Sequence, residues 1–269
     1  MPLDISLLFS FLLLGTFIGF MAGLFGIGGG GIMVPVLTAL FLHYGIAADS
    51  AVHLALGTSM ASIVMTSIAS LRAHHAKQAV LWRVVRTMSP GIVVGTLLAT
   101  FLAVRVSGLA LALFFSVYMA YASAQMFLDR KPQPSRELAG NTTLVLVGCG
   151  IGVISALVSI GGGSLTVPFL VWQNVNIKKA IGTSAAMGLP ISLAGSVGYM
   201  VNGWGQSTET GSYTVGFVYL PAVLLISLAS SVTAPLGARW AHQLSVASLK
   251  KGFAVLLLLL SLNMLLSVL

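Results

Sequence analysis

The sequence predicts an all-α polytopic integral membrane protein made of two inverted-topology repeats, each with about five hydrophobic segments. Composition, the lengths of the apolar segments and an internal repeat support this prediction. Of the 269 residues, 57% are hydrophobic and only 7% are charged, whereas soluble domains carry about 25% charged residues. Most of the exterior must therefore face the lipid bilayer. The net charge of +8 lies in short loops and indicates orientation rather than a nucleic-acid partner.

The apolar segments fall into two length classes. A bilayer core needs about 20 helical residues, and eight runs approach this length: 5–25, 50–71, 84–104, 107–128, 141–160, 178–201, 216–235 and 247–268. Two shorter runs, 32–42 and 164–173, each follow a glycine cluster. We expect about eight full-length helices and two short helices that are broken or re-entrant. Because no Lys or Arg precedes Arg72, the first run does not resemble a signal peptide and is expected to be retained.

The chain contains an internal repeat. The segment Ile27–Pro35 aligns without gaps on Ile160–Pro168, with six of nine positions identical. Further on, Ala-Leu-Gly-Thr-Ser at 55–59 matches Ala-Ile-Gly-Thr-Ser at 180–184. We take residues 1–128 and 141–269 as two transmembrane repeats, joined by a polar linker at 129–140.

The basic residues predict how the repeats are oriented. When all ten segments alternate sides, 12 of the 13 Lys and Arg residues fall on one side and only Arg105 on the other. Basic loops stay in the cytoplasm, so we expect both termini outside and the 72–86 and 129–137 loops inside. Each repeat then crosses an odd number of times, and the repeats are inverted as in many secondary transporters.

The glycine clusters predict an anion-binding site. If a short helix begins after each cluster, with Pro35 and Pro168 in its first turn, its free N–H groups and positive dipole end point into the break. Such a site binds anions without charged side chains. The alternative is that the glycines only allow close helix packing. The candidate residues are Gly28, Gly29, Gly30, Gly31, Gly161, Gly162, Gly163 and Ser164.

Hydroxyl and cationic side chains add to this candidate site. The paired hydroxyls of Thr58, Ser59, Thr183 and Ser184 could donate to anion oxygens, or could bond back to a helix carbonyl. One turn before them, His53 and Lys178 occupy equivalent positions. Each could attract an anion to one mouth of the pathway. A solvated interfacial charge explains Lys178 equally well, and His53 could instead carry a proton.

The acidic residues and the single cysteine argue against an enzyme. All five carboxylates lie in loops or at ends: Asp4, Asp49, Asp129, Glu137 and Glu209. Without an intramembrane carboxylate, acid/base catalysis and a metal site are disfavoured. Cys149 has no ligand-like neighbours at suitable spacing and is interpreted as a buried small residue. We expect no catalysis, no metal and no cofactor.

Three sequence features resemble a known family. These are the Gly-Gly-Gly-x-x-x-x-Pro element in each repeat, the paired Ala-x-Gly-Thr-Ser segments, and Ala-Pro-Leu-Gly-Ala-Arg at 234–239. Together they resemble the TauE/SafE sulfite exporter family, also called toluene sulfonate uptake permeases, over nearly the whole chain. The resemblance implies a multi-pass protein of a prokaryotic inner membrane that exports small sulfur-containing anions such as sulfite or sulfoacetate.

Residues and resemblance together predict a secondary transporter. It would hold a small oxyanion where the two glycine breaks meet, and would work by alternating access as one half rocks against the other. Two alternatives remain: a membrane-embedded partner or assembly subunit of an enzyme, and an anion channel. The sequence leaves open the exact substrate, import versus export, a coupling ion versus uniport, the oligomeric state, and whether the short segments are re-entrant or fully spanning.

Overall fold

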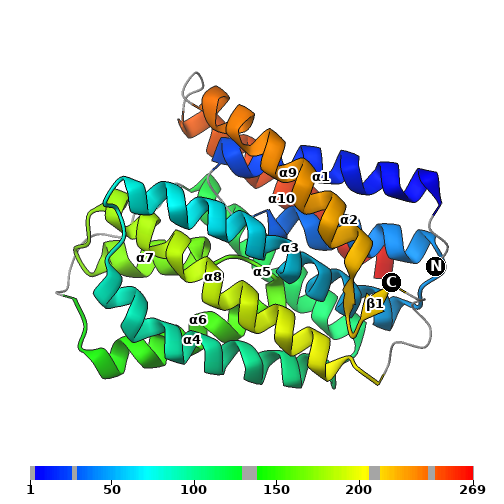
Figure 1. Ribbon diagram of the computed structural model, residues 1–269, viewed down its shortest axis with the longest axis horizontal. Coiled ribbons are helices and arrows are strands. Elements are labelled where there is room, and N and C mark those ends of the chain that lie inside the picture. Colours follow the sequence, from blue (N-terminus) through cyan, green and yellow to red (C-terminus); the bar gives the residue numbers. More distant parts are fainter. Residues whose placement is uncertain (1–3, 26–28, 129–137, 206–212, 242–245, 269) are drawn as a thin grey trace.

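The predicted helices are confirmed in a computed structural model that describes residues 4–25, 29–128, 138–205, 213–241 and 246–268 (Figure 1). Within these ranges, eight helices are long and apolar enough to span a membrane, and two apolar helices are shorter. The helices are α1 (Ile5–Phe25), α2 (Gly30–His43), α3 (Ala48–Ala76), α4 (Trp82–Ala103), α5 (Gly108–Phe127), α6 (Asn141–Val158), α7 (Gly163–Trp172), α8 (Ile177–Asn202), α9 (Leu220–Ala241) and α10 (Val246–Val268). A small antiparallel hairpin, β1 (Thr214–Val215) and β2 (Val218–Tyr219), precedes α9.

The two short helices begin earlier than their prolines suggested. Gly29 and Gly162 are the N-cap residues of α2 and α7. Pro35 and Pro168 therefore lie in the second turn, and the prediction that they lie in the first turn was wrong. Because glycine needs no side-chain room at a close approach, each helix can start inside its glycine cluster and run through the proline.

Most helix packing joins one repeat to the other. The most extensive packed pairs are α1 with α9, α4 with α6, α3 with α8 and α5 with α10. In the two repeats α1 corresponds to α6 and α4 corresponds to α9, so the α1–α9 pair and the α4–α6 pair are equivalent. The corresponding helices α3 and α8 run antiparallel to each other (Figure 1). The repeats therefore interlock about an approximate twofold axis. The expectation that one half rocks against the other as a unit does not fit this packing.

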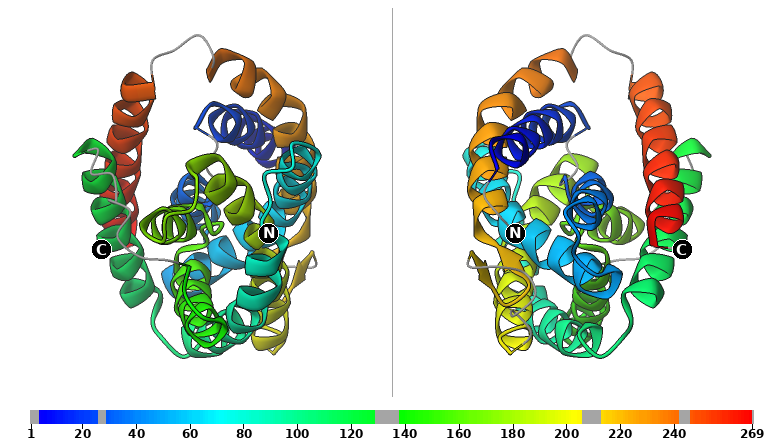
Figure 2. Two further views of the ribbon diagram at one scale, coloured as in Figure 1. Left: turned by 90° about the vertical axis from the view of Figure 1, so that its left-hand side faces the viewer. Right: turned by 90° about the vertical axis from the view of Figure 1, so that its right-hand side faces the viewer.

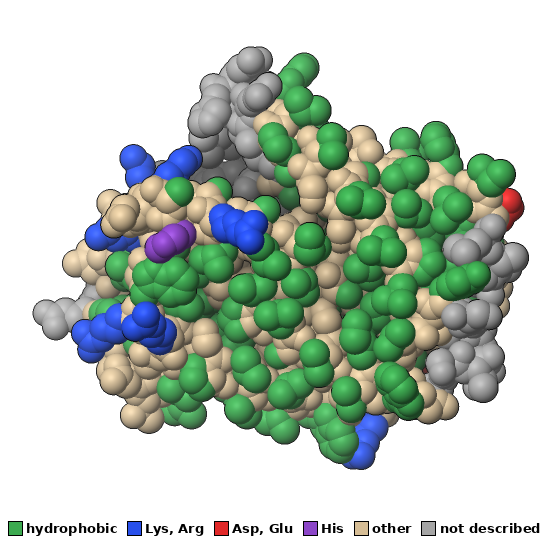
Figure 3. Space-filling view, in the orientation of Figure 1, with side chains coloured by type: hydrophobic (Ala, Val, Ile, Leu, Met, Phe, Trp, Pro, Cys, Tyr) green, Lys and Arg blue, Asp and Glu red, His purple; other side chains and the backbone are tan. Residues whose placement is uncertain are grey.

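The short helices lie in the middle of the molecule. Seen end-on, α2 and α7 are surrounded by the long helices (Figure 2), and most residues of α2 are buried. Apolar side chains cover much of the face shown in Figure 3. The repeat boundaries at 128 and 141 stay a prediction, since most of the linker, residues 129–137, lies outside the described residues.

The two ends of the molecule differ in their number of basic side chains. The start of α1, the end of α10 and the hairpin lie at one end, whereas the α3–α4 connection and the start of α8 lie at the other (Figure 1). On the face shown in Figure 3, most Lys and Arg side chains gather at this second end. Since basic loops stay in the cytoplasm, we call this second end the inner end and the opposite one the outer end.

Single-cysteine labelling tests this orientation. The half-buried Cys149 is first replaced by alanine, and cysteine is then introduced as Lys77→Cys or Arg105→Cys, at opposite ends. A membrane-impermeant thiol reagent applied to intact spheroplasts is expected to label position 105 and to label position 77 only after lysis. The opposite pattern would contradict the assignment of inner and outer ends.

Candidate functional site

The two glycine breaks meet inside the protein. A Cβ atom on Gly30, the first residue of α2, would overlap the carbonyl oxygen of Ser159 in the break between α6 and α7. Ser159 has a positive φ of 50°, and its hydroxyl donates to the carbonyl of Leu56 in α3 at 3.3 Å. The second break thus packs directly on the start of α2 and is held by α3.

The break before α2 is lined by apolar side chains. A Cβ on Gly29 would overlap Cγ2 of Ile18, and a Cβ on Gly31 would lie 3.3 Å from side-chain atoms of both Met119 and Leu257. Gly28 lies outside the described residues. Neither Gly29 nor its equivalent Gly162 provides a side-chain cap, so within the described residues the N-cap position of each short helix leaves the first N–H groups without a side-chain acceptor.

The break before α7 carries free hydroxyl groups. Thr166 and Ser184 are buried, with exposed fractions of 0% and 2%, and neither hydroxyl has a hydrogen-bond partner among the described residues. A Cβ on Gly162 would lie 3.2 Å from Thr166 Oγ1, and a Cβ on Gly163 would lie 3.8 Å from Ser184 Oγ. Around Gly161, within the described part, a Cβ would meet no heavy atom within 4 Å. Two buried hydroxyls therefore lie beside this break, and there is open space beside Gly161.

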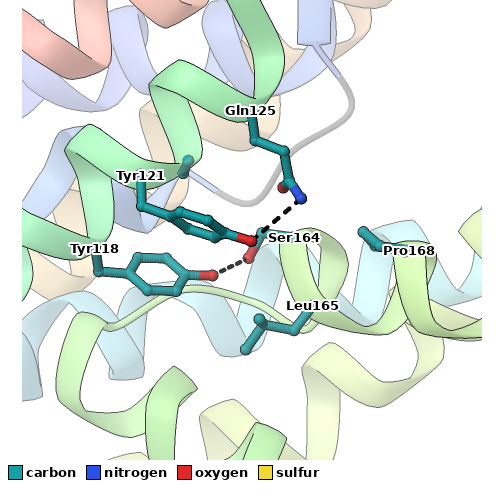
Figure 4. Close-up of a pocket in the computed structure, with 7 residues that line it drawn as sticks. Tyr118, Tyr121, Gln125, Ser164, Leu165 and Pro168 are labelled. Atoms are coloured by element: carbon teal, nitrogen blue, oxygen red, sulfur yellow. Dashed lines mark hydrogen bonds between the residues drawn. The ribbon is translucent and has the colours of Figure 1, made fainter. Parts of the chain in front are cut away.

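Ser164, in the first turn of α7, faces a separate small pocket. Its hydroxyl is hydrogen-bonded to the Tyr118 hydroxyl of α5 at 2.9 Å (Figure 4). The pocket has a volume of about 100 Å³ and lies between α5 and α7, with Tyr121, Gln125 and Pro168 among its lining residues. Ser164 is thus directed toward α5 of the first repeat.

The two Gly-Thr-Ser triplets occupy equivalent environments, in which glycine allows a close backbone approach. A Cβ on Gly57 of α3 would overlap the carbonyl oxygen of Phe217, before β2. A Cβ on Gly182 of α8 would overlap the carbonyl oxygen of Ala79, before α4. In both cases the contacted chain belongs to the other repeat.

The threonines anchor the same segments. Thr58 Oγ1 accepts a hydrogen bond from the backbone N–H of Tyr219 at 3.0 Å, just before α9. Thr183 Oγ1 accepts one from the backbone N–H of Leu81 at 2.9 Å, just before α4. Both threonines are fully buried. We call these two reciprocal contacts the threonine clasps.

The serines of the triplets are buried without partners. Ser59, like Ser184, has no hydrogen-bond partner among the described residues, and its exposed fraction is 0%. The alternative that these serines bond back to a helix carbonyl is thus not seen in the structure. Both hydroxyls keep an unused donor in the interior, where an unsatisfied polar group costs about 1–3 kcal/mol.

The structure does not bring these two serines together. Gly195 of α8 packs against Met60, and Gly188 packs against Ser67, so the antiparallel α3 and α8 place Ser59 near the level of Gly195. Gly195 lies eleven positions after Ser184 in α8, which is about 16 Å along the helix axis. One small oxyanion cannot contact both serines at once.

His53 and Lys178 lie away from the breaks. Lys178 is exposed at the start of α8, at the inner end. His53 is buried near the outer end of α3, with an exposed fraction of 5%, and lines a cavity of about 240 Å³ together with Asp49 and Arg105. These two positions therefore flank the candidate site at opposite ends.

Sequence reasoning missed Thr166 and Tyr118. Thr166 aligns with Met33 in the first repeat, so a search for features shared by both repeats passes over it. Tyr118 belongs to no motif, and its contact with Ser164 joins helices from different repeats. Only the three-dimensional packing identifies these two residues as neighbours of the second break.

Comparisons with known proteins find membrane transporters among the relatives of this chain. The family model described as sulfite exporter TauE/SafE matches residues 11–264. A probable membrane transporter protein of Haemophilus influenzae is 38% identical, covering 94% of this chain and 96% of that protein. One of Methanocaldococcus jannaschii is 27% identical, covering 97% and 99%, and one of Bacillus subtilis is 26% identical, covering 70% and 76%. No solved structure gives a significant match.

Proposed function

We propose that this chain, which belongs to the sulfite exporter TauE/SafE family and is a multi-pass membrane transporter, carries small sulfur-containing oxyanions, sulfite or organosulfonates such as sulfoacetate. Export is the proposed direction, because the matching family is described as exporters. The proposed process is secondary transport by alternating access.

The partnerless hydroxyls at the second break are the observation that carries this proposal. Thr166 and Ser184 are fully desolvated beside the uncapped start of α7. An oxyanion there would accept hydrogen bonds from both hydroxyls and from the first N–H groups of Gly163 and Ser164, and the helix dipole would favour its charge. Such a ligand offsets the desolvation cost of groups that are otherwise left unpaired.

The equivalent position at the first break would be a second anion-binding position along the pathway. Ser59 and the glycines before α2 are the sequence equivalents of Ser184 and the glycines before α7, and apolar side chains line the first break. We therefore assign Gly161, Gly162, Gly163, Ser164, Thr183 and Ser184 to an inner half-site and Gly28, Gly29, Gly30, Gly31, Thr58 and Ser59 to an outer half-site. An anion would occupy the half-sites in turn. The clasp threonines would position each half-site rather than bind the anion directly.

The interlocked packing suggests which parts would move. The α1–α9 and α4–α6 pairs are each tightly packed across the repeats and flank the α3–α8 pair (Figure 2). Motion of these two arms relative to the central helices would expose the half-sites alternately. This mode keeps each packed pair intact, unlike rocking of the two sequence repeats.

Serine and threonine variants test the inner half-site. Ser184→Ala and Thr166→Val are each expected to weaken oxyanion binding by about 1 kcal/mol, or about fivefold in Kd, because each removes one net hydrogen bond. The measurement is a thermal-shift titration of the purified protein with sulfite, followed by sulfite counterflow in proteoliposomes. Ser59→Ala should slow counterflow while changing the equilibrium affinity less.

Ser192→Ala is the matched control, because Ser192 is a buried serine of α8 whose hydroxyl already donates to the carbonyl of Leu189. It should keep wild-type affinity. Unchanged binding in both Ser184→Ala and Thr166→Val would contradict the proposed site. Sulfite flux without counterflow would favour the anion channel. Chloride flux equal to sulfite flux would argue against a site that selects anions by hydrogen bonds to three oxygens.

A further inference from the structure

We propose that His53 is a proton-binding site that couples proton uptake from the outer side to anion transport. This inference rests on the proposed function, since it names the coupling ion of the same carrier. It starts from the surroundings of a buried ionisable side chain within a membrane-spanning helix, which is rare and marks functional positions.

Both ring nitrogens of His53 face carbonyl oxygens. Nδ1 contacts the carbonyl of Asp49, one turn earlier in α3. Nε2 contacts the carbonyl of Ala103, the last residue of α4, at 2.9 Å. A neutral imidazole has a single N–H and can donate to only one of these oxygens, whereas a protonated ring donates to both. The geometry thus fits the protonated ring better than the neutral one.

The remaining surroundings also suit a proton site. The imidazole stacks on the Phe217 ring with centroids 5.1 Å apart, and a protonated ring is attracted to an aromatic face. The end of α4 contributes the negative end of its helix dipole. The charged groups that share the cavity, Asp49 and Arg105, have opposite signs, and Asp49 Oδ1 also accepts the Gly108 N–H at 2.7 Å. Because Arg105 is exposed, the cavity reaches the outer surface, from which a proton can arrive.

Protonation changes a contact between parts that are proposed to move. The neutral ring takes one proton on its unprotonated nitrogen and becomes an imidazolium, and release of that proton restores the neutral ring. The protonated ring donates to both carbonyls and so ties α3 to the end of α4, and this tie is lost when deprotonation leaves the remaining proton on Nδ1. Ser59 follows six residues later in α3, about 9 Å along the helix. The proton therefore biases the position of the helix that carries the outer half-site hydroxyl.

Proteoliposomes with a pH gradient test the coupling, with radiolabelled sulfite as the probe. A difference of about one pH unit should drive up to about tenfold sulfite accumulation by the wild-type protein if one proton moves per anion. His53→Gln should lose this accumulation while retaining sulfite–sulfite exchange. His43→Gln is the matched control, because His43 is an exposed histidine at the outer end of α2, and it should behave as wild type.

Three transport results would overturn the proposal: accumulation by His53→Gln at the wild-type level, loss of exchange together with accumulation in a folded variant, or no pH-driven accumulation by a wild-type protein that does exchange sulfite. If the wild-type protein exchanges no oxyanion, the proposed function fails. The protonation of His53 is then tested by a measurement that needs no substrate. In NMR spectra of protein labelled with ¹⁵N-histidine, the His53 signal is the one that is missing from the His53→Gln variant. At acidic pH this signal should show protons on both ring nitrogens. A ring that carries a single proton at acidic and neutral pH alike would overturn the proton site.

Discussion

Replacing Gly30 by alanine is expected to destabilise the protein by about 3 kcal/mol, at the upper end of the usual cost of overpacking. The added methyl group would overlap the carbonyl oxygen of Ser159 and would lie 3.0 Å from Cδ1 of Ile63. A backbone oxygen cannot move aside as the end of a flexible side chain can. Relief would require moving the start of α2 away from the second break. The measurement is the melting temperature of the purified protein in detergent.

Gly161→Ala provides the internal control from the other glycine cluster. Its added methyl group would meet no heavy atom of the described residues within 4 Å, so stability should stay within about 0.5 kcal/mol of wild type. If Gly30→Ala were as stable as Gly161→Ala, the close contact of the two breaks would not exist in the folded protein. Transport by Gly161→Ala further reports whether the space beside Gly161 belongs to the anion site.

Removing a threonine clasp is expected to cost about 1–3 kcal/mol of folding free energy, since Thr58→Val leaves the buried N–H of Tyr219 without its acceptor and Thr183→Val does the same to that of Leu81. Valine keeps the shape of threonine, so the effect reports the hydrogen bond. The double variant should lose roughly the sum of both costs, because the clasps lie in different parts of the molecule. Melting temperatures of the three variants measure this.

Thr87→Val serves as the control for the clasps. Thr87 lies on α4, and its hydroxyl bonds back to the Arg83 carbonyl in the same helix at 2.8 Å, so its loss should cost little. Single clasp variants that melt like Thr87→Val would mean that these hydrogen bonds do not hold the repeats together. Retained sulfite affinity in the folded fraction would support a positioning role for Thr58 and Thr183.

The fold followed from the sequence because lipid imposes simple rules on it. Segment length predicted eight spanning helices and two short ones, and all are found among the described residues. The start of the short helices was misjudged, because proline at a first turn is only a preference and glycine at 29 and 162 allowed an earlier start. Cys149 was expected to be buried and is half-buried.

The candidate site was less predictable than the fold. The repeated Gly-Thr-Ser motif identified segments that make close contacts between the repeats, but it could not separate the roles of its three residues. Those roles depend on what lies opposite: a carbonyl at Gly57, a backbone N–H at Thr58 and no partner at Ser59 among the described residues. Sequence spacing also could not show that Ser59 and Ser184 lie too far apart to share one ion.

The threonine clasps also bear on how such a chain could have arisen. Each clasp is made by the same residue type at the same place in its repeat, so the pair forms an isologous contact of the kind that joins identical subunits about a twofold axis. A chain of one repeat, inserted into the membrane in both orientations, could make both contacts as an antiparallel homodimer. Fusing two copies fixes one copy in each orientation and frees them to diverge. The pair Met33 and Thr166, apolar in one repeat and hydroxyl-bearing in the other, is the kind of difference that a homodimer could not have evolved.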